Sequence, residues 1–375
     1  MTAQTWPMVK LDSVTQIISG GTPKSTRSEF WGGDIKWATP KDLSNLQEKY
    51  ISKTERTLTE LGIQNSSAEL LPAGSVLFSS RAPIGHIAIN SVPMATNQGF
   101  KSFLPSNRLD ANFLYWWLNH NKAHLQAMGS GATFKELSKS AIQRISIPLP
   151  PLSEQKRIAA ILDKAYDLCQ LRRHALKKLD VLGEAIFHDM FGHIEQHNKN
   201  IHITKLENIV DILDNMRRPI TKKDRTPGIF PYYGATGILD YVDNYIFNEP
   251  LVLLGEDGAK WGKLEKSAYP ISGKTWVNNH AHVLKPNRKK IIDSFLIFFL
   301  NKTDLTPFIS GTTVPKLNQK NTRQIPIPLP PLAEQERFAA RIAKLEALQE
   351  HHRQALAKQE MLFQSLQQRA FRGEL

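Results

Sequence analysis

The chain has 375 residues, of which 41% are hydrophobic and 22% are charged, a balance typical of a folded protein with two or three domains. Its longest apolar runs, at 113–118 and 295–300, are too short to cross a bilayer, and residues 1–13 lack the apolar stretch of a secretory signal. The composition therefore excludes a wholly disordered chain and a membrane-spanning one.

Cysteine content and net charge further restrict the kinds of protein that this chain can be. The single cysteine, Cys169, excludes an internal disulfide and a multi-cysteine zinc site, so we expect a cytoplasmic protein. Apolar neighbours favour a core position for Cys169 over a nucleophilic one. The chain has 48 Lys and Arg against 35 Asp and Glu, a net charge of +13. This excess favours a polyanionic partner, nucleic acid first, over a soluble protein that is merely basic.

The chain repeats itself. The segment IPLPPLSEQKRIAAIL starts at Ile147, and IPLPPLAEQERFAARI starts 180 residues later, at Ile327. The similarity extends towards the N-terminus: DANFLYWWLN (110–119) aligns with IDSFLIFFLN (292–301), NQGFKSFLP (97–105) with NNHAHVLKP (278–286), and VKLDSV (9–14) with TKLENI (204–209). Two copies of one unit, each with a divergent front and a shared tail, indicate a duplication rather than a solenoid.

Each tail predicts a long helix led by prolines. The PLPPL segment favours an extended approach, after which Ser153 and Glu154 supply an N-cap and an acidic first turn. Arg172 interrupts the apolar stripe of the first tail, and His352 and Gln359 interrupt that of the second. The apolar residues recur with a period of about 3.5, at positions 158, 161, 165, 168, 175, 179, 182 and 186, and at 338, 342, 345, 348, 355, 362, 366 and 370. We expect the two helices to pair as a coiled coil; the alternative is that each packs on its own domain.

The order of the elements predicts the direction of this pair. The first helix leads from the first front into the second, so the second helix runs back if the halves are equivalent. Short strand-like runs in the fronts alternate with Gly, Pro and Asn turns, and the runs at 113–118 and 295–300 predict short buried helices. We therefore expect a mixed α/β (α+β) protein with two globular domains separated by an antiparallel coiled coil of two long helices, a dumbbell with a pseudo-two-fold internal repeat. The expected boundaries are 1–150 for the first domain, 151–192 for the first helix, 193–330 for the second domain and 331–375 for the second helix.

The basic residues gather in the two fronts. Residues 153–190 carry seven basic and six acidic side chains and residues 333–372 carry seven and five, so +10 of the +13 lies outside the helices. Basic ends on a nearly neutral rod suit a duplex that is contacted at two separated places. The candidate contacts are residue types that neutralise phosphate or pair with base edges. They are Lys24, Thr26, Arg27, Lys41 and Arg81 in the first front and Arg217, Arg218, Lys222, Lys223, Arg225, Lys260, Lys263, Lys274, Asn278 and Asn279 in the second.

Catalytic motifs are missing from the sequence. The segment SGKT lacks the upstream glycine of a phosphate-binding loop, and the only Pro-Pro pairs lie in PLPPL rather than in the (N/D)PP(Y/F) motif of an amino-methyltransferase. Glu256, Asp257 and Lys260 could form a carboxylate–lysine nuclease site, but the first front lacks the equivalent acidic partner. His280 and His282 with Asp257 could bind a metal, although buried or DNA-facing roles are favoured. The pattern favours binding, with no catalytic residue, metal site or cofactor in this chain.

Together these motifs resemble the specificity subunit of type I restriction–modification systems over essentially the whole chain. The most specific are the paired IPLPPLxEQxR tails, which are closed by IFHDMFG (186–192) and LFQSLQQRAFRGEL (362–375). SGGTP with FWGGDIKW in the first front, and YYGATGILDYV with SGKTWVNNHAHVL in the second, are similar to the two types of target-recognition domain of that family. The resemblance implies that each front reads one half of a split, asymmetric double-stranded DNA target.

The resemblance also implies partners. Two modification subunits, which bind S-adenosylmethionine and methylate adenine, would dock on the paired helices. Restriction subunits, the ATP- and Mg-dependent motor–nuclease, would join them to cut unmodified DNA. This chain would be a non-catalytic subunit that contacts no membrane. The alternatives are a stand-alone double-stranded DNA-binding protein, such as a repressor or architectural factor, and an enzyme that fuses recognition to methylation, which the missing methyltransferase motif disfavours.

Overall fold

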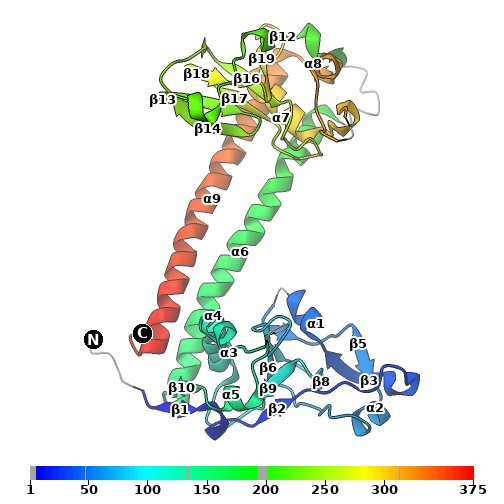
Figure 1. Ribbon diagram of the computed structural model, residues 1–375, viewed down its shortest axis with the longest axis vertical. Coiled ribbons are helices and arrows are strands. Elements are labelled where there is room, and N and C mark those ends of the chain that lie inside the picture. The colour runs from blue at the N-terminus through cyan, green and yellow to red at the C-terminus, as the bar shows by residue number, and fades with distance from the viewer. Residues whose placement is uncertain (1–5, 47, 132–134, 193–200, 312) are drawn as a thin grey trace. The chain divides into compact units, whose positions relative to one another are not determined.

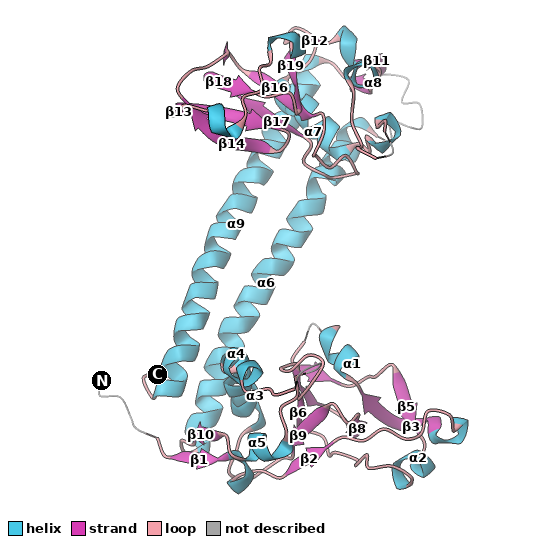
Figure 2. Ribbon diagram, in the orientation of Figure 1, coloured by secondary structure: helices cyan, strands magenta, loops and turns pink. Residues whose placement is uncertain are grey.

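The computed structural model describes residues 6–46, 48–131, 135–192, 201–311 and 313–375. The chain divides into two compact units (Figure 1). The first unit comprises Met1–Arg173 and Gln354–Leu375, and the second comprises His174–Arg353. Within the described part of the chain, no helix has both the length and the hydropathy needed to span a bilayer. Each unit combines short strands with helices (Figure 2), which confirms the predicted mixed α/β class.

The first unit contains two sheets. The larger has five strands, in the order β2 (Ile17–Ser19), β9 (Phe100–Phe103), β6 (Val76–Ser79), β7 (Ile87–Asn90) and β4 (Tyr50–Ile51). The smaller has the order β5 (Arg56–Leu58), β3 (Trp31–Ala38) and β8 (Met94–Thr96). A separate antiparallel pair joins β1 (Met8–Lys10) to β10 (Ser146–Pro148). Three short helices, α1 (Pro40–Ser44), α2 (Glu60–Gln64) and α5 (Lys139–Gln143), complete the loops around the sheets.

The larger sheet is covered on both faces. Val76 and Phe78 of β6 belong to one core cluster, while Leu77 between them belongs to another. Alternate residues of a strand point to opposite faces, so the whole of β6 is buried. One of these faces carries α3 (Ala111–His120), which is followed by α4 (Lys122–Ala127).

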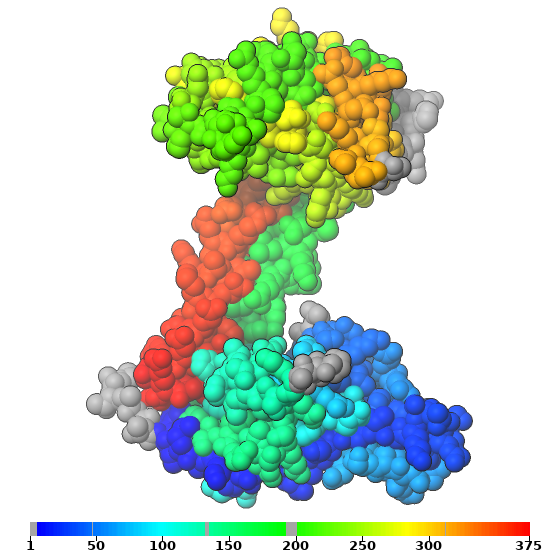
Figure 3. Space-filling view, viewed as in Figure 1, coloured from blue at the N-terminus to red at the C-terminus, as the bar shows by residue number. Residues whose placement is uncertain are grey.

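Helix α3 contains the first of the two predicted buried helices. All six side chains at 113–118 are buried, because the helix packs against the sheet and against the two long helices of its unit. A helix that is apolar all round is stable only when it is enclosed in this way. Asp110 caps its start by accepting the backbone N–H groups of residues 112 and 113. The end of the last helix, red in Figure 3, packs against this part of the unit.

The second unit repeats this plan. One sheet has the order β12 (Val210–Ile212), β19 (Ala281–Pro286), β16 (Leu251–Gly255) and β17 (Ala268–Ile271), which matches β2-β9-β6-β7. The other has the order β14 (Gly237–Val242), β13 (Pro227–Gly234), β18 (Lys274–Val277) and β15 (Phe247–Asn248), whose first three strands match β5-β3-β8. β11 (His202–Lys205) pairs with β20 (Pro326–Leu329), α7 (Asp293–Lys302) carries the second predicted buried helix, and α8 (Gln319–Arg323) corresponds to α5. The repeat in the sequence is a repeat of the fold.

Two helices of 40 and 41 residues, α6 (Leu152–Phe191) and α9 (Leu332–Arg372), confirm the predicted proline-led tails. In the first unit the start of α6 packs against the end of α9, with the rings of Tyr166 and Phe363 centred 5.8 Å apart. In the second unit the end of α6 packs against the start of α9, with Phe187 and Phe338 5.6 Å apart. The two helices are therefore antiparallel within each unit.

The polar residues that interrupt the apolar stripes bond to each other. Arg172 Nε donates to Gln359 Oε1 at 3.4 Å, and the next residues along each helix, Arg173 and Glu360, form an ion pair. Cys169 is buried, as predicted, and burial raises the pKa of its thiol. The predicted stripe is wrong at four leucines, because apolar packing concentrates where α3 or α7 adds a third partner to the helix pair. The four are Leu168, Leu182, Leu348 and Leu362, which are 47%, 41%, 44% and 57% exposed.

Candidate nucleic-acid interface

One turn has the same construction in both units. It connects the two sheets of each unit, between β8 and β9 in the first unit and between β18 and β19 in the second. Asn97 Oδ1 accepts the backbone N–H two residues on at 2.9 Å, and Asn278 Oδ1 does so at 2.8 Å. The residues at the tips, Gln98 and Asn279, are exposed. This agreement confirms the alignment of 97–105 with 278–286 at the level of single hydrogen bonds.

In the first unit the basic loop at 20–27 lies against this turn. A Cβ atom on Gly20 would lie 1.9 Å from the Asn97 carbonyl oxygen, so the approach requires glycine. The predicted contacts Lys24, Thr26 and Arg27 are all exposed on this loop. Arg27 forms a surface ion pair, 3.5 Å to Glu29, and pairs of this kind are weak enough to be exchanged for a phosphate.

Two tryptophans hold this loop in place. Trp31 Nε1 donates to the Lys24 carbonyl at 3.3 Å, and Trp37 Nε1 donates to the Gly21 carbonyl at 3.0 Å. The two rings meet edge to face, 5.0 Å between centroids, and the Arg56 guanidinium lies 3.5 Å above the Trp31 ring. Aromatic and cation–π contacts of this kind give the loop a fixed shape before any ligand arrives.

Lys41 and Arg81 border the same turn. A Cβ atom on Gly99 would lie 3.5 Å from Arg81 Cγ and 3.5 Å from the first residue of α1. Lys41, the next residue of α1, lies 2.8 Å from Glu55, and this hydrogen bond raises the pKa of the lysine. Arg81 lies 3.7 Å from Glu136. The structure therefore brings Arg81 and the start of α1, which carries Lys41, to the Asn97 turn, and Gly20 and Thr22 join the loop that carries Lys24, Thr26 and Arg27 to it.

The second unit places Arg217 in its interior. The Arg217 side chain is 13% exposed and lies 2.6 Å from Glu256 and 3.4 Å from Asp214. Its Nη1 also donates to the Ala281 carbonyl at 2.8 Å. Burial raises the pKa of Asp214, but its hydrogen bond to His282 and the nearby cationic groups outweigh burial, so the pKa lies below its ordinary value. The predicted contact Arg217 is thus engaged by the protein's own acceptors.

The neighbouring basic residues face outward. Arg218, Lys222 and Lys223 are exposed. Aromatic side chains hold their loop as they do in the first unit: Trp276 Nε1 donates to the Arg218 carbonyl at 2.6 Å, and the Tyr232 hydroxyl accepts the Ile220 N–H at 3.0 Å. The two units therefore present their basic loops by the same device.

The remaining predicted contacts are spread over the second unit. Arg225 is half-buried, with its guanidinium 4.4 Å from the Tyr232 ring centroid and 3.1 Å from Asp240. Lys274 is exposed on β18, beside the Tyr245 ring at 4.7 Å. Asn278 is buried in its turn, whereas Asn279 is exposed.

Two predicted lysines lie on the loop between β16 and β17. Lys260 is 82% exposed and lies 3.9 Å from Glu265. Lys263 lies 3.1 Å from Glu184 of α6, so the side chain of this predicted DNA contact is directed at the helix. The structure therefore gathers Arg218, Asn278 and Asn279 at the turn, and it does not bring Lys260 or Lys263 to them.

Sequence reasoning missed Gln98 at the tip of the first turn and Lys101 beneath it, and it considered His282 only as a metal ligand. Lys101 is 7% exposed, and burial lowers the pKa of its ammonium group although Glu136 lies 3.7 Å away. The aligned residue in the second unit is His282, which is fully buried. Gln98 was not among the predicted contacts because its side chain is uncharged, and the search in the first front followed the basic residues. The alignment of 97–105 with 278–286 contains the signal, because it pairs Gln98 with the predicted contact Asn279 in the turn and Lys101 with His282 in the strand that follows.

A buried acidic cluster in the second unit offers metal-type ligands. Oxygen and nitrogen atoms of Asp214, Glu256 and His282 lie within 4.8 Å of one another. Arg217 and Lys316 already neutralise these carboxylates, at 2.6 and 3.0 Å from Glu256. We therefore assign the cluster a structural role. His280 bonds Asp257 instead of joining His282, so the metal set considered from sequence does not assemble among the described residues.

The carboxylate–lysine arrangement considered from sequence does not assemble either. Glu256 is buried and bonded by Arg217 and Lys316, whereas the Lys260 side chain is 82% exposed and lies 3.9 Å from Glu265. A nuclease of this type needs its lysine and carboxylates to converge on one phosphate. Glu256 and Asp257 both lie against Lys316, at 3.0 and 3.6 Å, and Lys260 does not join them.

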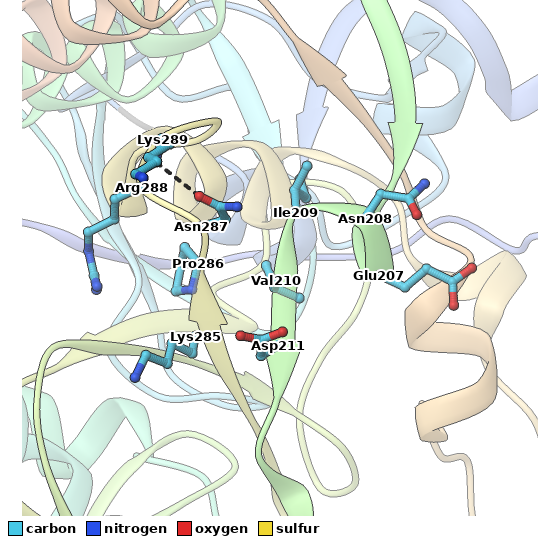
Figure 4. A pocket seen from close by; sticks show the side chains of 10 residues that line it. All are labelled: Glu207, Asn208, Ile209, Val210, Asp211, Lys285, Pro286, Asn287, Arg288 and Lys289. Atoms are coloured by element: carbon cyan, nitrogen blue, oxygen red, sulfur yellow. Dashed lines mark hydrogen bonds between the residues drawn. The ribbon is translucent and has the colours of Figure 1, made fainter.

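A second repeated feature is a shallow depression at the other end of β19 and of β9. In the second unit it has a volume of about 470 Å³ and is lined by residues 207–211 and 285–289 (Figure 4). Lys285 and Arg288 lie on one side of it and Glu207 on the other, and Asn287 Oδ1 accepts the Lys289 N–H at 3.1 Å. The first unit has an equivalent of about 660 Å³, lined by 12–17, 105–108, 139 and 143. Charges of both signs line the walls without converging on one point, so we assign no ligand.

Comparison with known proteins places this geometry in a family. The model of the type I restriction modification DNA specificity domain matches residues 3–180 and again 198–359. The chain is 35% identical over 188 residues to the type I restriction enzyme MjaIX specificity subunit of Methanocaldococcus jannaschii, a match that spans 50% of this chain and 44% of that relative. It is 22% identical over 371 residues to the EcoprrI specificity subunit of Escherichia coli, spanning 90% of this chain and 87% of the relative.

A solved structure agrees on the fold. The S subunit of a type I restriction–modification system from M. genitalium superposes with a TM-score of 0.62 at 15% identity, covering 99% of this chain and 96% of that one. The family model covers both repeats, each with a basic loop, a braced turn and a proline-led helix. The chain belongs to the family of type I restriction modification DNA specificity domains.

Proposed function

We propose that this chain is the DNA sequence-specificity subunit of a type I restriction–modification complex, and that each unit binds one half of a bipartite double-stranded target. The observation that carries the proposal is the duplicated turn. Asn97 and Asn278 make the same hydrogen bonds in the two units, and a basic loop held by aromatic side chains lies near each. Lysine and arginine on such loops bind phosphate and set the register, while the turn meets the base edges.

We expect the two half-sites to differ, because the basic and the acidic residue that border each turn exchange positions between the units. Arg81 is bridged to Glu136 in the first unit, and Asp257 is bridged to Lys316 at the equivalent place in the second. The sign of the charge at each position is therefore reversed between the units. A base or phosphate that suits one arrangement meets repulsion in the other, which supports an asymmetric target.

In this proposal the chain itself is not catalytic and works with partners. Two modification subunits, which carry S-adenosylmethionine, dock on α6 and α9, and ATP- and Mg-dependent restriction subunits join them in the cytoplasm. Apolar side chains that stay exposed on both helices are available to these partners. They include Leu168, Leu171, Met361 and Leu362 in the first unit and Val181, Leu182 and Leu348 in the second. The recognition domains are assigned to 1–150 and 193–330, and the helices to 151–192 and 331–375.

The proposal is tested by the salt dependence of duplex binding. Replacing Arg218, Lys222 and Lys223 together with alanine should weaken binding of the full chain to duplex DNA. It should also lower the slope of log affinity against log salt by roughly 0.9 for each phosphate that is no longer neutralised. Fluorescence anisotropy over a range of salt concentrations measures both quantities.

A matched control changes three exposed lysines of α6, Lys156, Lys164 and Lys177, to alanine. The control removes the same net charge from the chain but touches neither turn. Its slope should stay close to that of the parent. An equal decrease in both variants would mean that DNA binding depends on total charge rather than on the recognition loops, and no binding by the parent in the presence of its partners would contradict the proposal.

A further inference from the structure

Building on the proposed function, we infer that Gln98 and Asn279 are equivalent base-reading residues, and that each recognises an adenine in the half-site of its own unit. Both occupy the tip of the duplicated turn and both are exposed. Both carry a carboxamide, although the fronts around them have diverged.

The tip residue is held by strands on both sides. In the first unit the Asn97 N–H donates to the Ala38 carbonyl at 3.0 Å, and the Ser80 N–H donates to the Gly99 carbonyl at 2.7 Å. These bonds tie the turn to β3 on one side and to the end of β6 on the other. Gln98 therefore projects from a rigid frame, which is what a group must do to discriminate between bases.

The second unit has the same frame. The Asn278 N–H donates to the Tyr233 carbonyl at 3.0 Å, and the Glu256 N–H donates to the His280 carbonyl at 2.8 Å. Arg217 Nη1 lies 3.4 Å from the Asn279 carbonyl oxygen. The buried Arg217 thus supports the tip from below, through the same guanidinium that Glu256 holds. Its role in this account is to position Asn279.

The carboxamides remain available to a ligand. The Thr22 hydroxyl donates to Gln98 Oε1, which orients the amide and leaves a second lone pair on that oxygen. Among the described residues none hydrogen-bonds Gln98 Nε2 or the Asn279 side chain. A carboxamide matches the major-groove edge of adenine, because its NH₂ donates to N7 while its oxygen accepts from the N6 amino group.

The surroundings suit a base contact rather than a solvated loop. Arg81 and Lys41 border the Gln98 turn, and Arg218 and Lys316 lie on the loops around the Asn279 turn. Arg218 is exposed and can neutralise a phosphate beside the base that the amide meets, and Lys41 and Arg81 can do so by exchanging their ion pairs with Glu55 and Glu136. Gln98 and Asn279 therefore lie where base contacts are expected, between groups that bind the backbone.

The test is selection of preferred sites from a pool of random duplexes by the full chain together with its modification subunits. Gln98→Ala should lower the preference for adenine at one position of one half-site by about tenfold or more. The other half-site should be unchanged. Asn279→Ala should do the reverse. Exposed amides away from the turns provide controls: Gln64→Ala in the first unit and Asn244→Ala in the second should leave every position as in the parent.

The isosteric changes Gln98→Glu and Asn279→Asp guard against misfolding. A carboxylate accepts from the N4 amino group of cytosine, so the preference at the affected position should move from adenine to cytosine. An unchanged site in both types of variant overturns the inference, as does a change in both half-sites or at a position that is not adenine in the parent. If the parent selects no sequence, the proposed function itself fails and the inference fails with it.

Discussion

Gln155 and Gln335 hold the same three backbone groups in their respective units. Gln155 Oε1 accepts the Asp110 N–H at 2.8 Å, while its Nε2 donates to the carbonyls of Arg108 and Pro150 at 3.0 and 2.9 Å. Gln335 makes the equivalent bonds at 3.0, 2.9 and 2.8 Å, to the backbone of residues 292, 290 and 330. Each buried glutamine therefore ties the start of a long helix to the loop that enters α3 or α7.

Loss of either glutamine side chain should destabilise its unit. Gln155→Ala or Gln335→Ala leaves a buried N–H and two carbonyls without their partner, and each such buried group costs about 1–3 kcal/mol. We expect similar decreases in stability for the two variants, because the bonds are the same. Urea unfolding measures the free energy. Gln364→Ala, at an exposed position of α9, should change it little, and equal stability of all three variants would contradict this role.

The helices that recur in the two units could be predicted from the sequence. The EQ pair after each PLPPL marks the helix starts at Leu152 and Leu332, and the runs at 113–118 and 295–300 form α3 and α7 as expected. These signals are local, since capping, proline and helical periodicity act within a few residues. The strand order was not predictable, because β2 has only three residues and pairs with β9, more than eighty positions away.

The candidate site was only partly predictable for the same reason. Arg217 and Arg218 are adjacent and chemically alike, yet the Arg217 side chain is only 13% exposed while Arg218 is exposed. What separates them is the position of Glu256 and Asp214, and the pairing of β16 with β19 brings Glu256 into place. Residue type identifies a basic loop, but burial within that loop depends on these distant partners.

Trp37 and Tyr232 should matter for DNA binding without touching DNA. Trp37→Phe removes the donor to the Gly21 carbonyl, and Tyr232→Phe removes the acceptor for the Ile220 N–H. Both side chains are buried, so each change should cost about 1–3 kcal/mol of unfolding free energy. Each substitution should also weaken duplex binding, because the basic loop of its unit loses its fixed shape.

Anisotropy and urea unfolding on the same samples check this prediction. Tyr241→Phe, whose ring is 51% exposed on β14, is the matched control and should behave as the parent does. A Trp37→Phe protein with parental affinity and parental salt dependence would show that the loop needs no support from the indole.

His86 should make the stability of the first unit sensitive to mild acid. Burial, and then the charge of Lys122, lower the pKa of this imidazole below its ordinary value. Between the lowered folded pKa and the unfolded value of about 6.5, the unfolded chain binds more protons than the folded one. The contribution of His86 to the free energy of unfolding is therefore fully present above about pH 6.5, and it is lost as the pH falls through the pKa of the folded state.

The check is the free energy of unfolding of parent and His86→Gln between pH 7.5 and 5. The parent should lose more stability over this window than the variant, which cannot take up the proton. Parallel curves for the two proteins would mean that protonation of His86 is not coupled to folding.

The central claim is that two self-contained units each read one half of a target, and exchange of one unit tests it most directly. Residues 1–150 are replaced by the corresponding segment of a relative with a different known target, and the preferred site of the hybrid complex is selected from random duplexes. The account predicts that one half-site changes to that of the donor while the half-site read by residues 193–330 stays the same. A change in both half-sites, or in neither, would contradict it.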